Sequence, residues 1–91
     1  MKIIDNKIWH DDEKVGRIDG AHIRDHDDNK VGYFENNIIY NAAARKVAYV
    51  HENELIFVDG QPNISLEHIN VEIEGTVPLL AKCAVHVLME D

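Results

Sequence analysis

Histidine and aspartate side chains gather in two loop segments of this 91-residue chain, and the two segments occupy equivalent places in a repeated pattern. The first segment contains His10 and Asp11, and the second contains Asp25, His26 and Asp27. Imidazole and carboxylate groups together suit zinc or another divalent ion. If the fold brings the two loops close, these side chains would form a divalent-metal site.

A plainer interpretation of the same residues is that Asp and Asn are good turn formers on exposed loops. Asp25, Asp27 and Asn29 also match the first half of a calcium-binding loop, but Lys30 stands where the turn glycine belongs. The third equivalent loop, residues 41–45, contains no carboxylate. We therefore favour turn formation over metal binding, and we expect no cofactor.

Nucleophilic catalysis has few candidate residues in this chain. Ser65 is the only serine and Thr76 the only threonine, and both are better explained as helix caps. The single cysteine, Cys83, lies in an apolar segment where a thiol has a raised pKa and behaves as a small hydrophobe. We therefore predict a protein that is not an enzyme. A small hydrolase built on the loop histidines and aspartates is the less favoured alternative.

Aromatic residues recur along the first half of the chain, at Trp9, Tyr33, Tyr40 and Tyr49. Together they could form a surface that binds a peptide or a sugar. Aromatic side chains at recurrent positions more often pack on the face of a sheet. We favour packing and keep the binding surface as an alternative.

The charge balance narrows the range of partners. Seventeen acidic and nine basic residues give a formal net charge of −8, which disfavours binding to nucleic-acid backbones or to anionic membranes. The same charge suits a basic protein partner. The first residues contain no apolar run of signal-peptide length, and the most apolar stretch, residues 77–89, is shorter than the roughly 20 residues that span a bilayer. We therefore expect a cytoplasmic protein.

The elements that must position these residues follow a sixteen-residue repeat. It is clearest at Lys14-Val15-Gly16, Lys30-Val31-Gly32 and Lys46-Val47-Ala48. A short fixed period indicates one supersecondary unit stacked on copies of itself. Turn-forming pairs lie between β-prone runs at Asp5-Asn6, Asp19-Gly20, Glu35-Asn36 and Glu52-Asn53. These features predict four β-hairpins in residues 1–58. The recurring small residue indicates a crowded place where the copies converge, near a pseudo-symmetry axis.

Residues 59–91 follow a different pattern and predict one or two helices. Residues 65–74 alternate as a strand would but also share a helical face, and we favour a helix capped by Ser65 and ended by Gly75. Thr76 is expected to cap a second helix with Pro78 in its first turn. This helix is apolar almost all round, with a polar stripe of Lys82, His86 and Glu90.

A helix this apolar must be buried nearly everywhere. It can pack across the hairpins or form a subunit interface through Leu80, Ala84, Val87 and Leu88. Ninety-one residues make a single small domain with a thin stability margin, which favours a homo-oligomer. We therefore expect a mainly β (α+β) domain over residues 1–91, acting as a non-catalytic interaction or assembly module. A divalent-metal-binding protein is the alternative from a different class.

The hairpin pattern resembles the bacterial 4-fold β-flower domain family. The residues that carry the resemblance are Ile23-Arg24-Asp25 with Lys30-Val31-Gly32-Tyr33-Phe34, and Ile39-Tyr40-Asn41 with Lys46-Val47-Ala48-Tyr49-Val50. The resemblance covers roughly residues 3–58. It implies four hairpins around a pseudo-fourfold axis in a bacterial protein of unknown function, and it brings no activity and no site residue.

Overall fold

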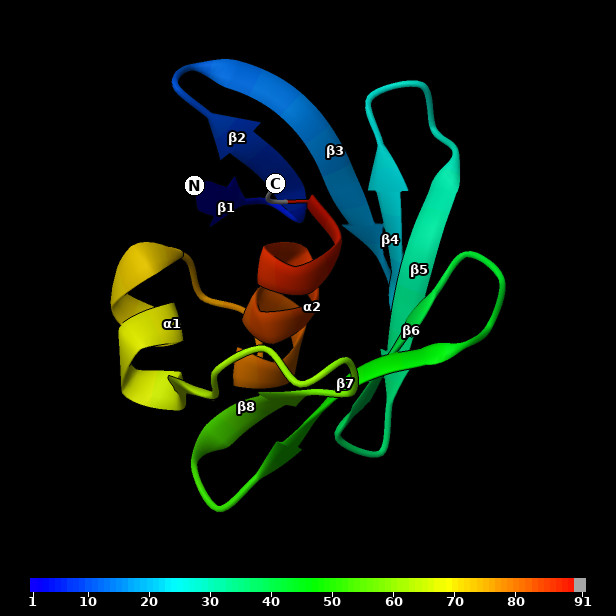
Figure 1. Cartoon of the computed structure of the whole chain (residues 1–91). Helices are drawn as coiled ribbons and strands as arrows, with labels where there is room; N and C mark the ends of the chain where they lie inside the picture. The colour runs from blue at the N-terminus through cyan, green and yellow to red at the C-terminus, as the bar shows by residue number, and fades with distance from the viewer. Residues whose placement is uncertain (90–91) are drawn as a thin grey trace.

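The computed structural model describes residues 1–89 and is mainly β. A nine-stranded antiparallel sheet, in which every strand pairs with the next along the chain, is followed by two helices. The strands are β1 (Lys2–Ile4), β2 (Lys7–His10), β3 (Glu13–Asp19), β4 (His22–Asp25), β5 (Lys30–Glu35), β6 (Ile38–Asn41), β7 (Lys46–His51), β8 (Glu54–Phe57) and β9 (Ile64–Ser65). The helices are α1 (Leu66–Glu72) and α2 (Leu79–Met89). The sheet curls around α2, with α1 beside it (Figure 1).

The segment after α1 closes this curled sheet. The Ile3 amide donates to the Glu74 carbonyl at 2.7 Å, and the Glu74 amide donates to the Met1 carbonyl at 3.2 Å. Strand β1 is thereby bridged to Glu74 at one edge of the sheet, while β9 runs directly into α1 at the other. Covered edges prevent the backbone of an outer strand from pairing with another chain.

Tight turns with positive backbone φ join the strands, as the turn-forming residues predict. Asp5-Asn6 and Glu52-Asn53 have positive φ at both positions, as a type I′ hairpin turn requires. The other two turn predictions are wrong by one residue. The third turn is Asn36-Asn37, because β5 continues through Glu35, and the second is Gly20-Ala21, because Asp19 pairs with His22 at the end of the ladder.

Three register shifts interrupt the ladders, between Ile8 and Trp9, Ile23 and Arg24, and Ile39 and Tyr40. Opposite them lie the small residues Gly16, Gly32 and Ala48, all of which are buried. A Cβ added at Gly32 would overlap the Tyr40 carbonyl oxygen and lie 2.5 Å from Leu88 Cδ1. The crowding indicated by the small residues is therefore present at Gly32.

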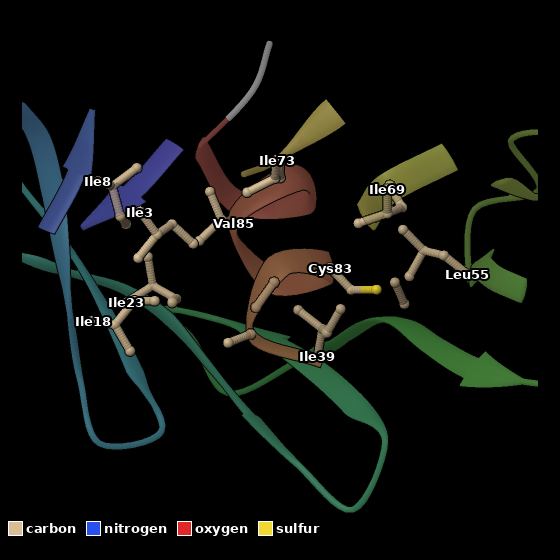
Figure 2. Close-up of a cluster of buried hydrophobic side chains, with 13 residues drawn as sticks. Ile3, Ile8, Ile18, Ile23, Ile39, Leu55, Ile69, Ile73, Cys83 and Val85 are labelled. Atoms are coloured by element: carbon tan, nitrogen blue, oxygen red, sulfur yellow. The ribbon is translucent and has the colours of Figure 1, made fainter. Parts of the chain in front are cut away.

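The core surrounds α2 (Figure 2). Strands β2, β4, β6 and β8 each contribute one fully buried aliphatic side chain, namely Ile8, Ile23, Ile39 and Leu55. Helix α1 contributes Ile69, and α2 contributes Cys83, Ala84 and Val85. The middle of α2, residues 81–85, is thus covered within one chain, and the apolar residues at its two ends are partly buried. Neither helix in residues 1–89 is long and apolar enough to cross a bilayer.

The helix predictions are confirmed in position and corrected at their ends. Ser65 caps α1 by accepting from the His68 amide at 3.1 Å, but the helix ends at Glu72, with Ile73 as its C-cap, and not at Gly75. It stops there because the backbone of Glu74 pairs with β1. Thr76 does not cap α2, since the helix starts at Leu79 and the Pro78 carbonyl accepts from its first-turn amides.

The polar stripe of α2 faces α1. Lys82, a member of the predicted polar stripe, is only 5% exposed, and its Nζ donates to Asn70 Oδ1 at 2.8 Å. His86 contacts Glu72 of α1. The third member of the stripe, Glu90, lies outside the described residues. The stripe therefore joins the two helices, because α1 covers the side of α2 that the sheet leaves open.

Cys83 should be chemically inert in the folded protein. Burial raises the pKa of its thiol to about 11 from an ordinary 9.0, which lowers the thiolate fraction at pH 8 by about a hundredfold. We expect alkylation by iodoacetamide, followed by mass spectrometry, to be at least about a hundredfold slower in the native protein than in guanidinium chloride. Rates within about tenfold of each other would contradict this prediction.

Candidate functional site

The structure does not gather the histidines and aspartates of the two predicted metal loops. His10 Nε2 lies 3.5 Å from Asp11 Oδ2, and His26 Nε2 lies 3.4 Å from Asp27 Oδ2, so each imidazole pairs with its own neighbour in the chain. Strand β3 separates the ends of β2 and β4 that carry these loops. In residues 1–89, no three His, Cys, Asp or Glu side chains are placed to hold a metal ion.

The Asp25 side chain stabilises its own loop by accepting two backbone hydrogen bonds. Its Oδ1 accepts from the Asp27 amide at 3.0 Å and from the Asn29 amide at 2.9 Å. Sixteen residues later, Asn41 Oδ1 accepts from the Ala43 and Arg45 amides at 2.9 and 3.0 Å. The two loops therefore use the same hydrogen bonds, and a neutral amide serves as well as a carboxylate. This geometry is that of a turn-forming Asx side chain.

We expect Asp25→Asn to change the free energy of unfolding by less than about 0.5 kcal/mol, because the amide oxygen can accept both hydrogen bonds. Asp25→Ala removes the acceptor and should cost about 1 kcal/mol. Urea unfolding of both variants checks this prediction. Two results together would instead favour the metal site. Asp25→Asn would lose much of its stability, and a divalent ion would stabilise the parent but not this variant.

The predicted interface residues all lie on α2. Ala84 is fully buried within the chain, so its side chain has no surface to offer another subunit. Leu80, Val87 and Leu88 are partly buried and pack against the same core. These α2 side chains thus pack, wholly or in part, against the core of their own chain. An oligomer formed through these three residues stays a prediction.

An open pocket of about 710 Å³ lies beside the last turns of α2. It brings together residues from the end of β6, from β7, from β8 and the turn that follows it, from the end of α1 and from α2. The described lining residues are Asn41, Val47, Phe57, Asp59, Gln61, Glu72, His86, Val87 and Leu88. One part of this lining is polar and the other is apolar.

Glu72 connects two imidazoles at the polar side of the pocket. Its Oε1 lies 3.2 Å from His86 Nδ1, and its Oε2 lies 3.1 Å from His68 Nε2. His68 precedes Glu72 by four residues, so one turn of α1 places both side chains on the same face. The His86 side chain is 18% exposed, whereas that of His68 is 65% exposed. Glu72 thereby holds the less exposed imidazole in a defined orientation at the pocket.

Asp59 supplies a second carboxylate. Gln61 Nε2 donates to its Oδ2 at 2.7 Å, and this hydrogen bond, with a further one from the Gln61 amide, lowers the pKa of Asp59. The carboxylate is therefore ionised at neutral pH. No lysine or arginine occurs among the described residues of the lining. The pocket thus favours a cation or a hydrogen-bond donor at its polar side and an alkyl group against Val47, Phe57 and Val87.

Sequence reasoning found only part of this site. His86 stands out as a polar residue on an apolar helix, but nothing in the sequence links it to Asp59 or Glu72, which lie in segments of ordinary turn and helix composition. Comparisons with protein-family models, with curated proteins and with solved structures found no match to the chain. The geometry of the pocket is therefore the basis on which a function can be assigned.

Proposed function

We propose that this protein is a non-catalytic binding module whose pocket beside α2 takes an ammonium or guanidinium group carried on an apolar stem. The observation that carries the proposal is the combination, in one pocket of about 710 Å³, of Asp59 and Glu72 with an apolar wall. The volume is in the range of sites that bind small molecules or side chains. None of the described lining residues is a serine, threonine, cysteine or lysine that could act as a nucleophile.

The natural source of such a group is a lysine or arginine side chain of a basic protein partner. The part of the chain that supplies most of the pocket lining, residues 52–89, is strongly acidic. Within residues 52–89 the charged residues other than histidine are Glu52, Glu54, Asp59, Glu67, Glu72, Glu74 and Lys82. Because Lys82 is buried against Asn70, the surface of this part carries almost only negative charge. A field of one sign steers an oppositely charged partner toward the site.

Two-dimensional NMR titration with a short peptide of alternating lysine and leucine tests this proposal. The same peptide with norleucine in place of lysine is the uncharged control, and acetyl-lysine-amide distinguishes a small amine from a peptide partner. We expect the lysine peptide to shift the amide signals of Asp59, Gln61 and Val87. Asp59→Asn should weaken the affinity about tenfold, because a hydrogen bond to a charged group contributes about 1.5–3 kcal/mol.

Glu67→Gln is the matched control for this titration. Glu67 is an exposed acid on α1 that does not line the pocket, so its variant removes the same charge and should change the affinity less than about threefold. Equal losses in the two variants would show non-specific charge attraction and would refute the pocket. Equal binding of the norleucine peptide would refute recognition of the cation.

A second candidate function is hydrolysis, and the Glu72–His86 contact favours it. An imidazole whose Nδ1 is held by a carboxylate can act as a general base toward a water molecule. We would then expect slow turnover of p-nitrophenyl acetate that falls at least about tenfold in His86→Gln. His51→Gln, at the exposed last residue of β7, is the control. Equal rates in both variants would refute this candidate.

We also propose that the strands are four copies of one hairpin arranged around α2, as the β-flower resemblance implies. Three observations support this arrangement. The register shifts lie at equivalent positions, the Asp25 and Asn41 loops use the same hydrogen bonds, and the second strand of each copy buries one aliphatic side chain. In this arrangement the four hairpins enclose α2, and the last turns of α2 line the pocket.

A further inference from the structure

The outer face of the sheet carries rows of directly paired side chains. Cross-strand partners in an antiparallel sheet point to the same side. Their neighbours Ile23 and Ile39 are buried against α2, so these rows point away from the core. The register gives one row as Lys7, Arg17, Arg24 and Lys30, the next as His22, Tyr33, Tyr40 and Lys46, and the third as Ile38, Tyr49 and Ile56.

The middle of this face is an aromatic surface edged by two cations. Tyr33 and Tyr40 stack with ring centroids 4.6 Å apart and planes 15° from parallel. Lys30 Nζ lies 5.5 Å from the Tyr33 ring centroid, and Lys46 Nζ lies 5.1 Å from that of Tyr49. The three tyrosines are only half-buried. We call these five residues the tyrosine surface.

Lys30 and Lys46 are the cations that lie against the tyrosine rings and that the tyrosine surface can offer to a partner. The neighbouring arginines are neutralised within the chain, since Arg17 Nε lies 2.8 Å from Asp28 Oδ1 and Arg24 Nε lies 3.3 Å from Asp19 Oδ2. Lys30 and Lys46 form no ion pair among residues 1–89, apart from their contacts with the tyrosine rings. An acidic partner with an apolar side chain at its centre would complement the tyrosine surface.

A surface of that description exists elsewhere on the same chain. Val71 is the most exposed large apolar residue, at 75%, and it follows the exposed Glu67 by four residues, so both lie on one side of α1. The Leu66 amide donates to the Asn53 carbonyl at 2.9 Å, which places the tip of the β7–β8 turn beside the start of α1. That tip adds Glu52 and Glu54. We call Glu52, Glu54, Glu67 and Val71 the acidic surface.

We propose that the acidic surface of one copy docks on the tyrosine surface of a second copy. Val71 would pack on the tyrosine rings while the carboxylates of the acidic surface approach Lys30 and Lys46. The two surfaces of one chain complement each other in both charge and apolar character, which favours a second copy as the partner. Neither surface includes a residue that lines the pocket. Because the two surfaces differ, the contact is heterologous, and copies add head to tail into a ring or a filament.

Analytical ultracentrifugation of the full chain tests the proposal. A contact centred on a seven-residue helix is small, so we expect a dissociation constant of roughly 0.1–1 mM. The weight-average mass should rise with protein concentration in about 25 mM salt and return to the monomer value in about 500 mM salt. A monomer at about 1 mM protein and low salt would overturn the proposal.

Charge reversal gives the sharper test. The first variant combines Lys30→Glu with Lys46→Glu, and the second combines Glu54→Lys with Glu67→Lys. Each change alters the charge by two units, so the variants carry −12 and −4 around the parent's −8. Each variant alone should be monomeric, because its two surfaces have the same sign. An equimolar mixture should associate, because every contact between unlike copies is again complementary.

The control variant combines Lys2→Glu with Lys14→Glu, which also gives −12 but leaves the tyrosine surface intact. When the salt concentration is adjusted to screen its additional net charge, this variant should retain at least about half of the parent's association. A mixture that stays monomeric would overturn the proposal. A control that dissociates like the Lys30 and Lys46 variant would also overturn it. Circular dichroism confirms that each variant is folded before its mass is compared.

Discussion

Gly32→Val should destabilise the protein by about 3 kcal/mol or more, and the variant is expected to be largely unfolded at 37 °C. A Cβ at Gly32 would overlap the Tyr40 carbonyl oxygen and lie 2.5 and 2.9 Å from the two terminal carbons of Leu88. The carbonyl belongs to the neighbouring strand and cannot move without breaking its ladder. Two further methyl groups would then press on the last turns of α2. Urea unfolding followed by circular dichroism measures the loss.

Ala42→Val is the matched control for this substitution. Ala42 lies on an exposed loop, so a valine there should change the free energy of unfolding by less than about 0.5 kcal/mol. The second comparison is Ala48→Gly, at the position opposite the third register shift. It should cost about 1 kcal/mol, because glycine loses more backbone freedom on folding. A Gly32→Val variant as stable as the parent would show that the space around Gly32 is not crowded.

Ile39→Ala should cost about 3–4 kcal/mol. Ile39 is fully buried between β6 and α2, beside Cys83 (Figure 2). Removing three carbons leaves a cavity that the surrounding strands cannot fill, because each is held by ladders on both sides. In a domain of this size the loss corresponds to a fall in melting temperature of roughly 12 °C or more. Calorimetry or a thermal melt measures it.

Ile4→Ala provides the contrast. Ile4 is 51% exposed on the outer side of β1, so its truncation should cost less than about 1 kcal/mol. The same chemical change thus has a several-fold different effect at the two positions. A cost below about 1 kcal/mol for Ile39→Ala would mean that α2 is not enclosed as described.

The sequence by itself determined the local elements. The pairs Asp5-Asn6 and Glu52-Asn53 form turns because Asn and its relatives tolerate positive φ, which depends on two or three neighbouring residues. Ser65 caps α1 for an equally local reason. The apolar character of residues 77–89 required burial wherever the helix packed. These predictions need no knowledge of distant parts of the chain.

Only the tertiary structure decided where α1 stops, how deeply Lys82 is buried and which residues line the pocket. Helix α1 ends at Glu72, before the extended C-cap Ile73, because Glu74 pairs with β1, some seventy residues earlier in the chain. Lys82 is buried because α1 covers the open side of α2 and Asn70 Oδ1 accepts a hydrogen bond from its ammonium group. Asp59, Glu72 and His86 meet through the same packing. Contacts between residues so far apart depend on how whole helices and strands pack together. A local pattern of residue types does not predict that packing.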